Sequence, residues 1–343
     1  MKGDTQMIAE TRVLVVGCGS IGRRHIKNLM SLGIRNFILC DTSEESLKAA
    51  SIGLENPVLT TKFKNALLQG PQAAVICTPS SLHLNMAIEL ARHGVHLLIE
   101  KPLSDTLDGI GELEKIVEER GLVAMMAMCY RFHPVFQQVK SLILSEVVGR
   151  VYHVNYFGGH YLPDWHPNAD YRIEYAARKK LGGGVILTSI HGLDNIRWLF
   201  GEVEESHAFV DKVSDLEMDV EDIATAIFRL KNGILANWQT DFLQRANQHR
   251  MVIAGSTGTI RADFLTGTVE TYSTELGKWY SGRVPFQVNE MYVAEAKHFF
   301  DCIEKKTAPE ADIKDGHKTL KLALDVKGSR NLLEERERIC RTA

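Results

Sequence analysis

Three groups of residues have the types and spacing that suit a bound nucleotide and a moving proton. The first is Gly17-Cys18-Gly19-Ser20-Ile21-Gly22, which has the spacing G-x-G-x-x-G between an apolar run and a predicted helix. In that context the first glycine permits a tight turn, the second lets the backbone approach a pyrophosphate, and the third lets the helix lie close to the strand. We therefore predict that a dinucleotide binds at Gly17, Gly19, Ser20, Ile21 and Gly22.

Asp41 comes 19 residues after Gly22, at the end of the next apolar run. A carboxylate in this place can accept hydrogen bonds from both hydroxyls of the adenosine ribose, and it would repel a 2′-phosphate. Thr42 and Ser43 follow it, and neither carries the positive charge that a 2′-phosphate needs. The sequence therefore favours NAD as cofactor, with NADP as the alternative.

The other two groups can handle an alcohol. Glu100-Lys101-Pro102 directly follows a predicted strand, where parallel sheets bind ligands, and the Lys101 ammonium can stabilise a developing alkoxide. His191 and Asp194 are three residues apart in a predicted amphipathic helix over 185–200, so Asp194 can orient His191 as the base. The alternatives are a solvated Lys-Pro turn and a half-buried histidine bonded to backbone.

The elements that must position these residues fall into two patterns. Over the first 125 residues, apolar runs alternate with helical periods, which predicts parallel strands with right-handed crossovers in a doubly wound Rossmann sheet. The expected strands are 11–16, 36–40, 73–77, 95–99 and 122–128, and the expected helices are 21–32, 43–52, 82–93 and 110–120.

Beyond Tyr130 the apolar residues alternate with polar ones, as in half-exposed strands. We expect a helix at 134–145, then strands at 150–156, 205–213, 223–230, 234–240, 251–254, 258–261 and 268–272, and closing helices at 291–305 and 314–337. These strands predict an antiparallel meander. The predicted domains are 1–129, an α/β Rossmann domain, and 130–343, an α+β domain with a large, mainly antiparallel open sheet, whose C-terminal helices can return to the first domain.

Composition excludes several classes of protein. Among 343 residues, 40 Lys and Arg face 43 Asp and Glu, so no basic excess favours nucleic acid. No apolar run reaches the roughly 18 residues of a membrane span, and the opening segment lacks the apolar core of a signal peptide. Six scattered cysteines predict neither disulfides nor a zinc site, and we expect no metal. The expectation is a cytoplasmic protein.

Together these motifs resemble the glucose–fructose oxidoreductase / inositol dehydrogenase / MocA (Gfo/Idh/MocA) family over essentially the whole chain. The resemblance also rests on Thr78-Pro79 with His83, and on the triple glycine at 182–184 before His191. It implies oxidation or reduction of a ring hydroxyl or carbonyl of a sugar or cyclitol with a nicotinamide cofactor, in dimers or tetramers paired through the C-terminal sheet. By position it implies that Lys101 and His191 are the active-site pair, and that Thr78, Pro79, His83 and Glu100 line the nicotinamide side of the groove.

One position departs from the family pattern. Many members carry an aspartate where this chain has Thr188, which can position a hydroxyl group but cannot accept a proton at neutral pH. Proton transfer then falls on His191, with Lys101 assisting, or the chain is a dinucleotide-binding sensor without turnover. The aromatic and polar segment 159–172 is predicted to be a substrate-binding loop, since aromatic faces stack on sugars. The expected substrate contacts are Tyr161, Trp165, His166, Asp170, Tyr171, Arg172, Thr188 and His191.

Overall fold

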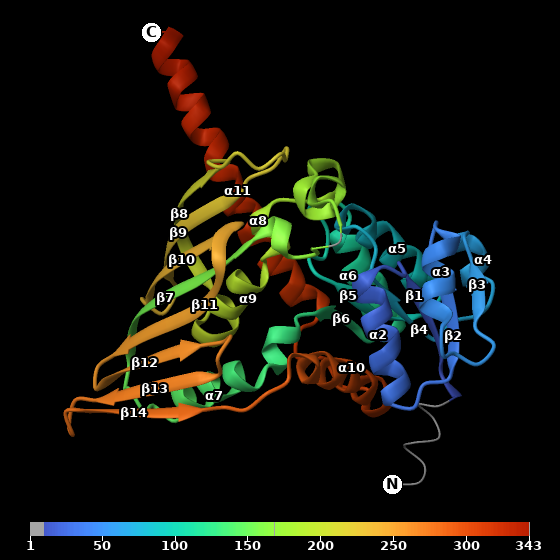
Figure 1. The fold of residues 1–343 in the computed structure, drawn as a ribbon, viewed down its shortest axis with the longest axis horizontal. Helices are drawn as coiled ribbons and strands as arrows, with labels where there is room; N and C mark the ends of the chain where they lie inside the picture. The colour runs from blue at the N-terminus through green and yellow to red at the C-terminus, as the bar shows by residue number, and fades with distance from the viewer. Residues whose placement is uncertain (1–9, 168, 343) are drawn as a thin grey trace. The chain divides into compact units, whose positions relative to one another are not determined.

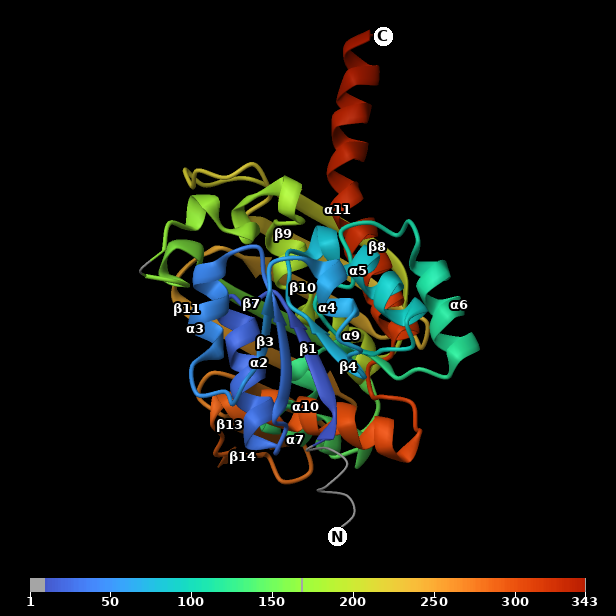
Figure 2. The same ribbon diagram turned by 90° about the vertical axis from the view of Figure 1, so that its right-hand side faces the viewer.

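The structure, a computed structural model, describes residues 10–167 and 169–342, with side chains described as far as Ser329. The opening segment, for which we expect no signal peptide, lies outside this range, as do Asn168 of the predicted substrate loop and the side chain of Cys340. The chain divides into two compact units, drawn in Figures 1 and 2. The first holds the chain through Cys129 together with Asn289–Lys318, and the second holds Tyr130–Val288 and the chain from Thr319. Within the described residues, no helix is both long enough and apolar enough to span a bilayer.

The first unit is built on a six-stranded sheet in the order β3-β2-β1-β4-β5-β6, and each of its strand pairs is parallel. Strand order reverses between β1 and β4, which is the switch point where such sheets bind ligands. This confirms the predicted doubly wound sheet. The strands are β1 (Arg12–Val16), β2 (Asn36–Cys40), β3 (Val58–Thr60), β4 (Ala73–Ile76), β5 (His96–Glu100) and β6 (Ala124–Ala127).

Helices connect these strands, and Figure 2 shows α2 and α3 to the left of the sheet and α5 and α6 to the right. The strands are continuous apolar runs because helices cover the sheet; Val13, Leu14 and Val15 are fully buried. Ser43 caps α3 by accepting a hydrogen bond from the Ser46 amide at 3.1 Å. The helices are α2 (Ser20–Ser31), α3 (Glu44–Ser51), α4 (Phe63–Leu67), α5 (Ser80–Arg92), α6 (Ile110–Arg120) and α10 (Val288–Lys305).

The second unit is built on an eight-stranded sheet in the order β14-β13-β12-β11-β7-β10-β9-β8. The strands are β7 (Val151–Tyr161), β8 (Val203–Asp211), β9 (Ile223–Leu230), β10 (Leu235–Asp241), β11 (Leu243–Gly255), β12 (Gly258–Asp263), β13 (Thr268–Ser273) and β14 (Lys278–Arg283). The helices α7 (Pro134–Leu144), α8 (Val185–Thr188) and α9 (His191–Phe200) lie along one face of it in Figure 1. A last helix, α11 (Ile313–Thr342), closes the described chain.

Alternation along the strands decides which residues enter the core of this unit. In β9, Ala224, Phe228 and Leu230 are buried on the helix side, whereas Ile227 between them is 57% exposed on the opposite face. This period of two is the reason that the sequence predicted a half-exposed sheet. The open face therefore carries apolar side chains that no helix of this unit covers.

The prediction of a large, mainly antiparallel sheet is confirmed, but its strands do not follow one another as a single meander. Strand β7 pairs in parallel with β10 and antiparallel with β11, so the first strand of the unit lies in the middle of the sheet. Periodicity shows which strands exist but not which neighbours they choose, because pairing is decided by side chains far apart in the sequence. The prediction also missed β3, α4 and β14; every residue of β14 is exposed, so it has no alternating pattern.

The prediction of one continuous amphipathic helix over 185–200 is also wrong. The helix is interrupted at Ser189 and Ile190, and α9 begins anew at His191. At the interruption, backbone hydrogen bonds join residues three apart instead of four apart. The Gly192 amide donates to the Ser189 carbonyl and the Leu193 amide to the Ile190 carbonyl, both at 3.1 Å. The segment is buried on nearly all sides, so it carries no wide polar face.

Candidate active site

The glycine-rich loop has the geometry that a pyrophosphate site needs. Gly17 has φ of 90°, and a Cβ there would lie 2.5 Å from the Cys77 carbonyl oxygen. A Cβ on Gly22 would collide with the Gly17 carbonyl oxygen, so this glycine lets α2 approach β1. A Cβ on Gly19 would meet no atom within 4 Å, which leaves open space at the N-terminus of α2. Ser20 and Ile21 form the first turn of that helix, where backbone amide groups can bind an anion.

Asp41 is held in place by the loop itself. Its Oδ2 accepts the Cys18 amide at 2.7 Å, and its Oδ1 accepts the Ser43 amide at 2.8 Å. A carboxylate offers about four lone-pair sites, so two backbone bonds still leave acceptors for two ribose hydroxyls. The open space at Gly19, the helix terminus and this fixed carboxylate fit a dinucleotide whose ribose carries both hydroxyls.

The segments after β4 and β5 place the next group of predicted residues at the carboxyl end of the sheet. Thr78 and Pro79 follow β4 and lead into α5, where His83 is buried. His83 Nδ1 lies 2.7 Å from the Pro102 carbonyl oxygen, and its Nε2 lies 2.7 Å from the Thr78 carbonyl oxygen. Burial lowers the pKa of His83. The imidazole thus ties the Thr78 segment to the Lys101–Pro102 turn, whose peptide bond is cis.

In the second unit, His191 is the first residue of α9 and lies against Tyr130, with ring centroids 4.5 Å apart and planes tilted by 33°. The spacing of Asp194 predicts that it orients His191, but its carboxylate binds Arg131 and Thr319 instead. Its two oxygens accept hydrogen bonds from Arg131 Nε at 2.8 Å and Nη2 at 2.6 Å, and Thr319 donates to Oδ1 at 3.2 Å. This buried pair anchors α9 to the start of the unit. Thr188, at the end of α8, is 2% exposed.

Tyr156 and His249, which sequence reasoning missed, lie next to Tyr130. The Tyr156 hydroxyl is 2.7 Å from His249 Nε2, and the His249 and Tyr130 ring centroids are 5.1 Å apart. Burial raises the pKa of Tyr156 and lowers that of His249 to about 3, so both groups are uncharged at neutral pH. A Cβ on Gly192 would lie 2.5 Å from Trp238 Nε1, so glycine lets α9 sit close to the sheet. Tyr156 belongs to β7 and His249 to β11, and only the pairing of these two strands brings them together.

The predicted substrate loop is held by contacts between its own residues and nearby strands. Arg172 binds Asp170, Tyr171 accepts the Glu217 amide at 3.1 Å, and His166 Nδ1 lies 2.7 Å from Glu174. Trp165 stacks on His160 with ring centroids 4.3 Å apart, and the Arg245 guanidinium lies 3.5 Å from the centre of the Tyr161 ring. These contacts give the loop a defined shape, and its role toward substrate stays a prediction.

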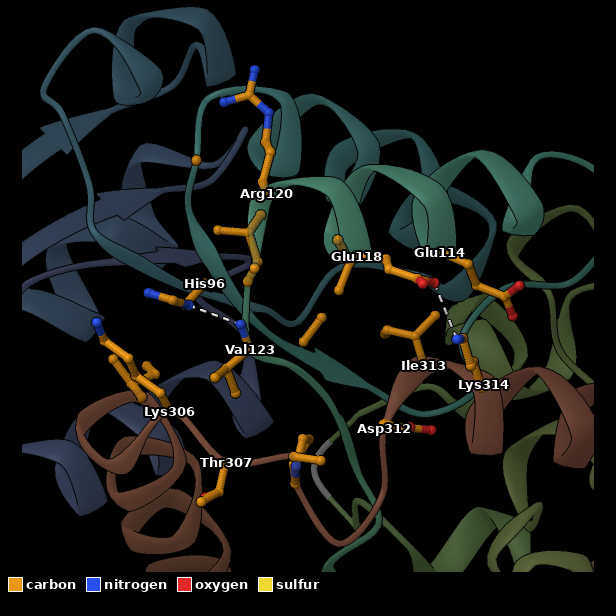
Figure 3. Close-up of a pocket in the computed structure, with 18 residues that line it drawn as sticks. His96, Glu114, Glu118, Arg120, Val123, Lys306, Thr307, Asp312, Ile313 and Lys314 are labelled. Atoms are coloured by element: carbon orange, nitrogen blue, oxygen red, sulfur yellow. Dashed lines mark hydrogen bonds and ion pairs between the residues drawn. The ribbon is translucent and has the colours of Figure 1, made fainter.

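A large pocket of about 970 Å³ lies elsewhere, wholly within the first unit (Figure 3). His96, the first residue of β5, and Val123, just before β6, line it together with α6 and the segment between α10 and α11. It is therefore at the amino ends of these strands, whereas Lys101 follows the carboxyl end of β5. Charges of both signs line it: Lys314 pairs with Glu118 at 3.2 Å (Figure 3).

Lys101 belongs to the first unit and His191 to the second, and their meeting over one nicotinamide ring stays a prediction. Among the residues whose side chains are described, no three His, Cys, Asp or Glu side chains gather as a metal site would require.

Comparison with known proteins shows which family the chain matches. Residues 11–128 match the model of an oxidoreductase family with an NAD-binding Rossmann fold, and residues 136–261 match the GFO/IDH/MocA C-terminal domain. Myo-inositol 2-dehydrogenase of Thermotoga maritima is 26% identical over 345 residues, covering 96% of this chain and 98% of that protein. UDP-N-acetylglucosamine 3-dehydrogenase of Acidithiobacillus ferrooxidans is 26% identical, covering 92% and 96%.

A solved levoglucosan dehydrogenase in complex with NADH and levoglucosan has the same fold, with a TM-score of 0.83 at 20% identity over 93% of this chain and 96% of that one. The resemblance seen in the motifs is confirmed across both halves of the sequence. The chain therefore belongs to the Gfo/Idh/MocA family of oxidoreductases.

Proposed function

We propose that the protein is an NAD-dependent dehydrogenase of a sugar, sugar derivative or cyclitol, acting between a ring hydroxyl and the corresponding carbonyl. The observation that carries this proposal is the first unit's nucleotide site, with open space at Gly19 beside an Asp41 carboxylate fixed by the Cys18 amide. The similar proteins named as inositol and nucleotide-sugar dehydrogenases support the substrate class. NADP is the less favoured cofactor because Asp41 would repel its 2′-phosphate.

The proposed chemistry divides between two side chains. A bound nicotinamide supplies the hydride acceptor or donor at its C4. His191 takes the hydroxyl proton during oxidation and returns it during reduction, as a histidine of near-neutral proton affinity can. The Lys101 ammonium stabilises the negative charge that develops on the substrate oxygen. Thr188, in the place of the family's usual aspartate, positions a hydroxyl group and does not accept the substrate proton.

The loop over 159–172 is proposed to bind the substrate. Trp165 is 37% exposed and offers an aromatic face, while Asp170 and Arg172 offer hydrogen-bonding groups to hydroxyls. Tyr161, His166 and Tyr171 complete the proposed contacts. Because Arg172 already holds Asp170, the pair presents a fixed acceptor and donor edge.

An absorbance assay at the NADH band tests the proposal. The purified chain is given NAD with each member of a panel: myo-inositol, scyllo-inositol, levoglucosan, xylose and UDP-N-acetylglucosamine. We expect that NAD is reduced to NADH with at least one member of the panel, and that the His191→Ala variant lacks this activity. NADH that binds tightly, as followed by its fluorescence, while no panel member is oxidised would favour the alternative of a dinucleotide-binding sensor.

The open face of the eight-stranded sheet supports a homodimer or homotetramer. It exposes Phe209 by 71%, Ile227 by 57% and Tyr152 by 47%, and large apolar side chains on a flat face favour pairing with a second copy. Light scattering after size exclusion tests this: we expect a multiple of 38.4 kDa for the chain and a smaller species for Ile227→Lys. A monomer at micromolar concentration would refute the pairing.

The cytoplasm is the proposed location. Cys18, Cys40, Cys77, Cys129 and Cys302 are free thiols in the structure. Burial raises the pKa of Cys18 to about 12 and that of Cys40 to about 11, which keeps them protonated and inert. Free thiols are the usual state in a reducing compartment.

A further inference from the structure

The backbone of Lys101 is bound by the carboxylate that precedes it. Glu100 ends β5 and is 8% exposed. Its Oε2 accepts the Lys101 amide at 3.2 Å, and its Oε1 accepts a hydrogen bond from Nε2 of His25 at 2.8 Å. His25 is fully buried in the middle of α2, the helix whose N-terminus forms the pyrophosphate site. One carboxylate therefore joins the cofactor-binding helix to the residue proposed to act on substrate oxygen.

The other side of Lys101 is bound as well. The Pro102 carbonyl oxygen lies 2.7 Å from Nδ1 of His83, which is 1% exposed. The backbone is thus fixed on both sides of Lys101 by buried imidazoles, one through Glu100 and one directly. Lys101 itself is only partly buried, so a flexible side chain starts from a rigid base.

A second carboxyl group lies near Glu100. Glu295, in α10, is fully buried, and neither of its oxygens has a hydrogen-bond partner among the described residues. Burial and the charge of Glu100 raise its pKa well above the ordinary value, which favours the neutral acid. Burial raises the pKa of the Cys77 and Cys129 thiols in the same unit. Glu100 itself accepts hydrogen bonds from both His25 and the Lys101 amide.

We propose that Glu100 is a positioning residue: its carboxylate, oriented by His25, fixes the Lys101 backbone relative to the cofactor-binding helix α2. Its effect on turnover rests on the proposed function, whereas its effect on Lys101 itself does not. Glu100 was predicted from the family resemblance to line the nicotinamide side of the groove. That prediction stays open, and its two oxygens have a further task inside the unit.

The first measurement needs no substrate. Lys101 is labelled with trace acetic anhydride at pH 8 in the protein without cofactor, and the rate is read by mass spectrometry. Glu100→Gln leaves one acceptor oxygen where two are used, so the turn loosens and the labelling rate of Lys101 rises by at least about threefold. His25→Gln has the same effect, and combining it with Glu100→Gln adds little, because both changes break one link.

The matched control is Glu114→Gln. Glu114 Oε1 lies 2.8 Å from Nδ1 of His317, the same type and length of contact in the same unit, but on α6. Its loss is expected to leave Lys101 labelling unchanged. If Glu100→Gln does not fold, as judged by circular dichroism, His25→Gln alone decides. The proposal is overturned if Lys101 is labelled at the wild-type rate in a folded Glu100→Gln or His25→Gln protein. It is also overturned if Glu114→Gln raises the labelling rate of Lys101 by as much.

The second measurement is turnover with the panel sugar oxidised fastest. Glu100→Gln is expected to lower kcat by about tenfold or more, because small misplacements of a catalytic group are costly, while the NADH Kd from fluorescence changes less than about threefold. In a Lys101→Ala background the same change is expected to have no further effect on kcat. An equal loss of kcat in that background would overturn the positioning role. If Lys101→Ala alone keeps wild-type turnover, the proposed function fails at Lys101, and the labelling result still decides the role of Glu100.

Discussion

The buried pair of Arg131 and Asp194 gives the sharpest test of how the second unit holds His191. The two side chains are 3% and 2% exposed and meet through two hydrogen bonds of 2.8 and 2.6 Å. Asp194→Asn leaves the guanidinium buried without its counter-charge. Breaking a buried pair from one side costs about 3–5 kcal/mol, a large part of the roughly 5–15 kcal/mol that holds a domain together.

The assay is urea unfolding followed by tryptophan fluorescence and circular dichroism for Asp194→Asn, Arg131→Met and the double variant. Each single variant is expected to lose about 3 kcal/mol or more, and the double variant less than the sum by at least about 1 kcal/mol, since it leaves no unpaired charge. Arg172→Met is the matched control, because Arg172 holds Asp170 with a similar two-point contact but the two side chains are 46% and 40% exposed. That change should cost far less than the buried variants, because water screens an exposed ion pair. Single variants no worse than this control, or strictly additive losses, would refute the reasoning.

Three further predictions concern pH and the proposed site. The pKa of His249 is lowered to about 3 by burial, so between about pH 6.5 and 3 the unfolded chain binds a proton that the folded chain does not. Stability is therefore expected to fall below about pH 6.5, by about 2 kcal/mol at pH 5 for this group, and His249→Gln should flatten the urea-midpoint profile; parallel profiles would contradict it. Asp41→Asn is expected to weaken NADH relative to NADPH by about tenfold in fluorescence titrations, because it loses charge repulsion and an acceptor; an unchanged ratio would exclude Asp41 as the selector. Lys101→Ala is expected to lower kcat by about 10²-fold or more while NADH still binds, and near-normal turnover would remove Lys101 from the mechanism.

Local features of the sequence predicted the first unit well. The run 36–40 and the helix 110–120 have the predicted bounds, because a continuous apolar run and a glycine stop are signals carried by neighbouring residues. The roles given to Gly17 and Gly22 are confirmed by what a Cβ would meet there. In such segments, local pattern and final environment agree.

Long-range partners could not be predicted in the same way. Spacing put Asp194 beside His191 on a helix face, but Arg131, from a distant turn, takes the carboxylate. Tyr156 and His249 become neighbours only through the register of β7 and β11, and no local period encodes that register. The interruption at Ser189 was not predicted either, because the run from Val185 to Phe200 has no glycine or proline at that point.

The first unit is discontinuous in sequence, and this bears on how the protein emerges from the ribosome. The Met126 amide of β6 donates to the Ala311 carbonyl oxygen at 2.8 Å, and Glu295 joins the buried interior of the same unit. A nascent chain that has reached Cys129 therefore holds all six strands of the nucleotide-binding sheet but lacks the helix that finishes its interior. It must keep apolar surface exposed, or shielded by a chaperone, while the whole second sheet is translated. A fragment ending at Cys129 is accordingly a poor choice for producing the nucleotide-binding half alone, whereas joining residues 289–318 to it by a short linker would restore the missing layer.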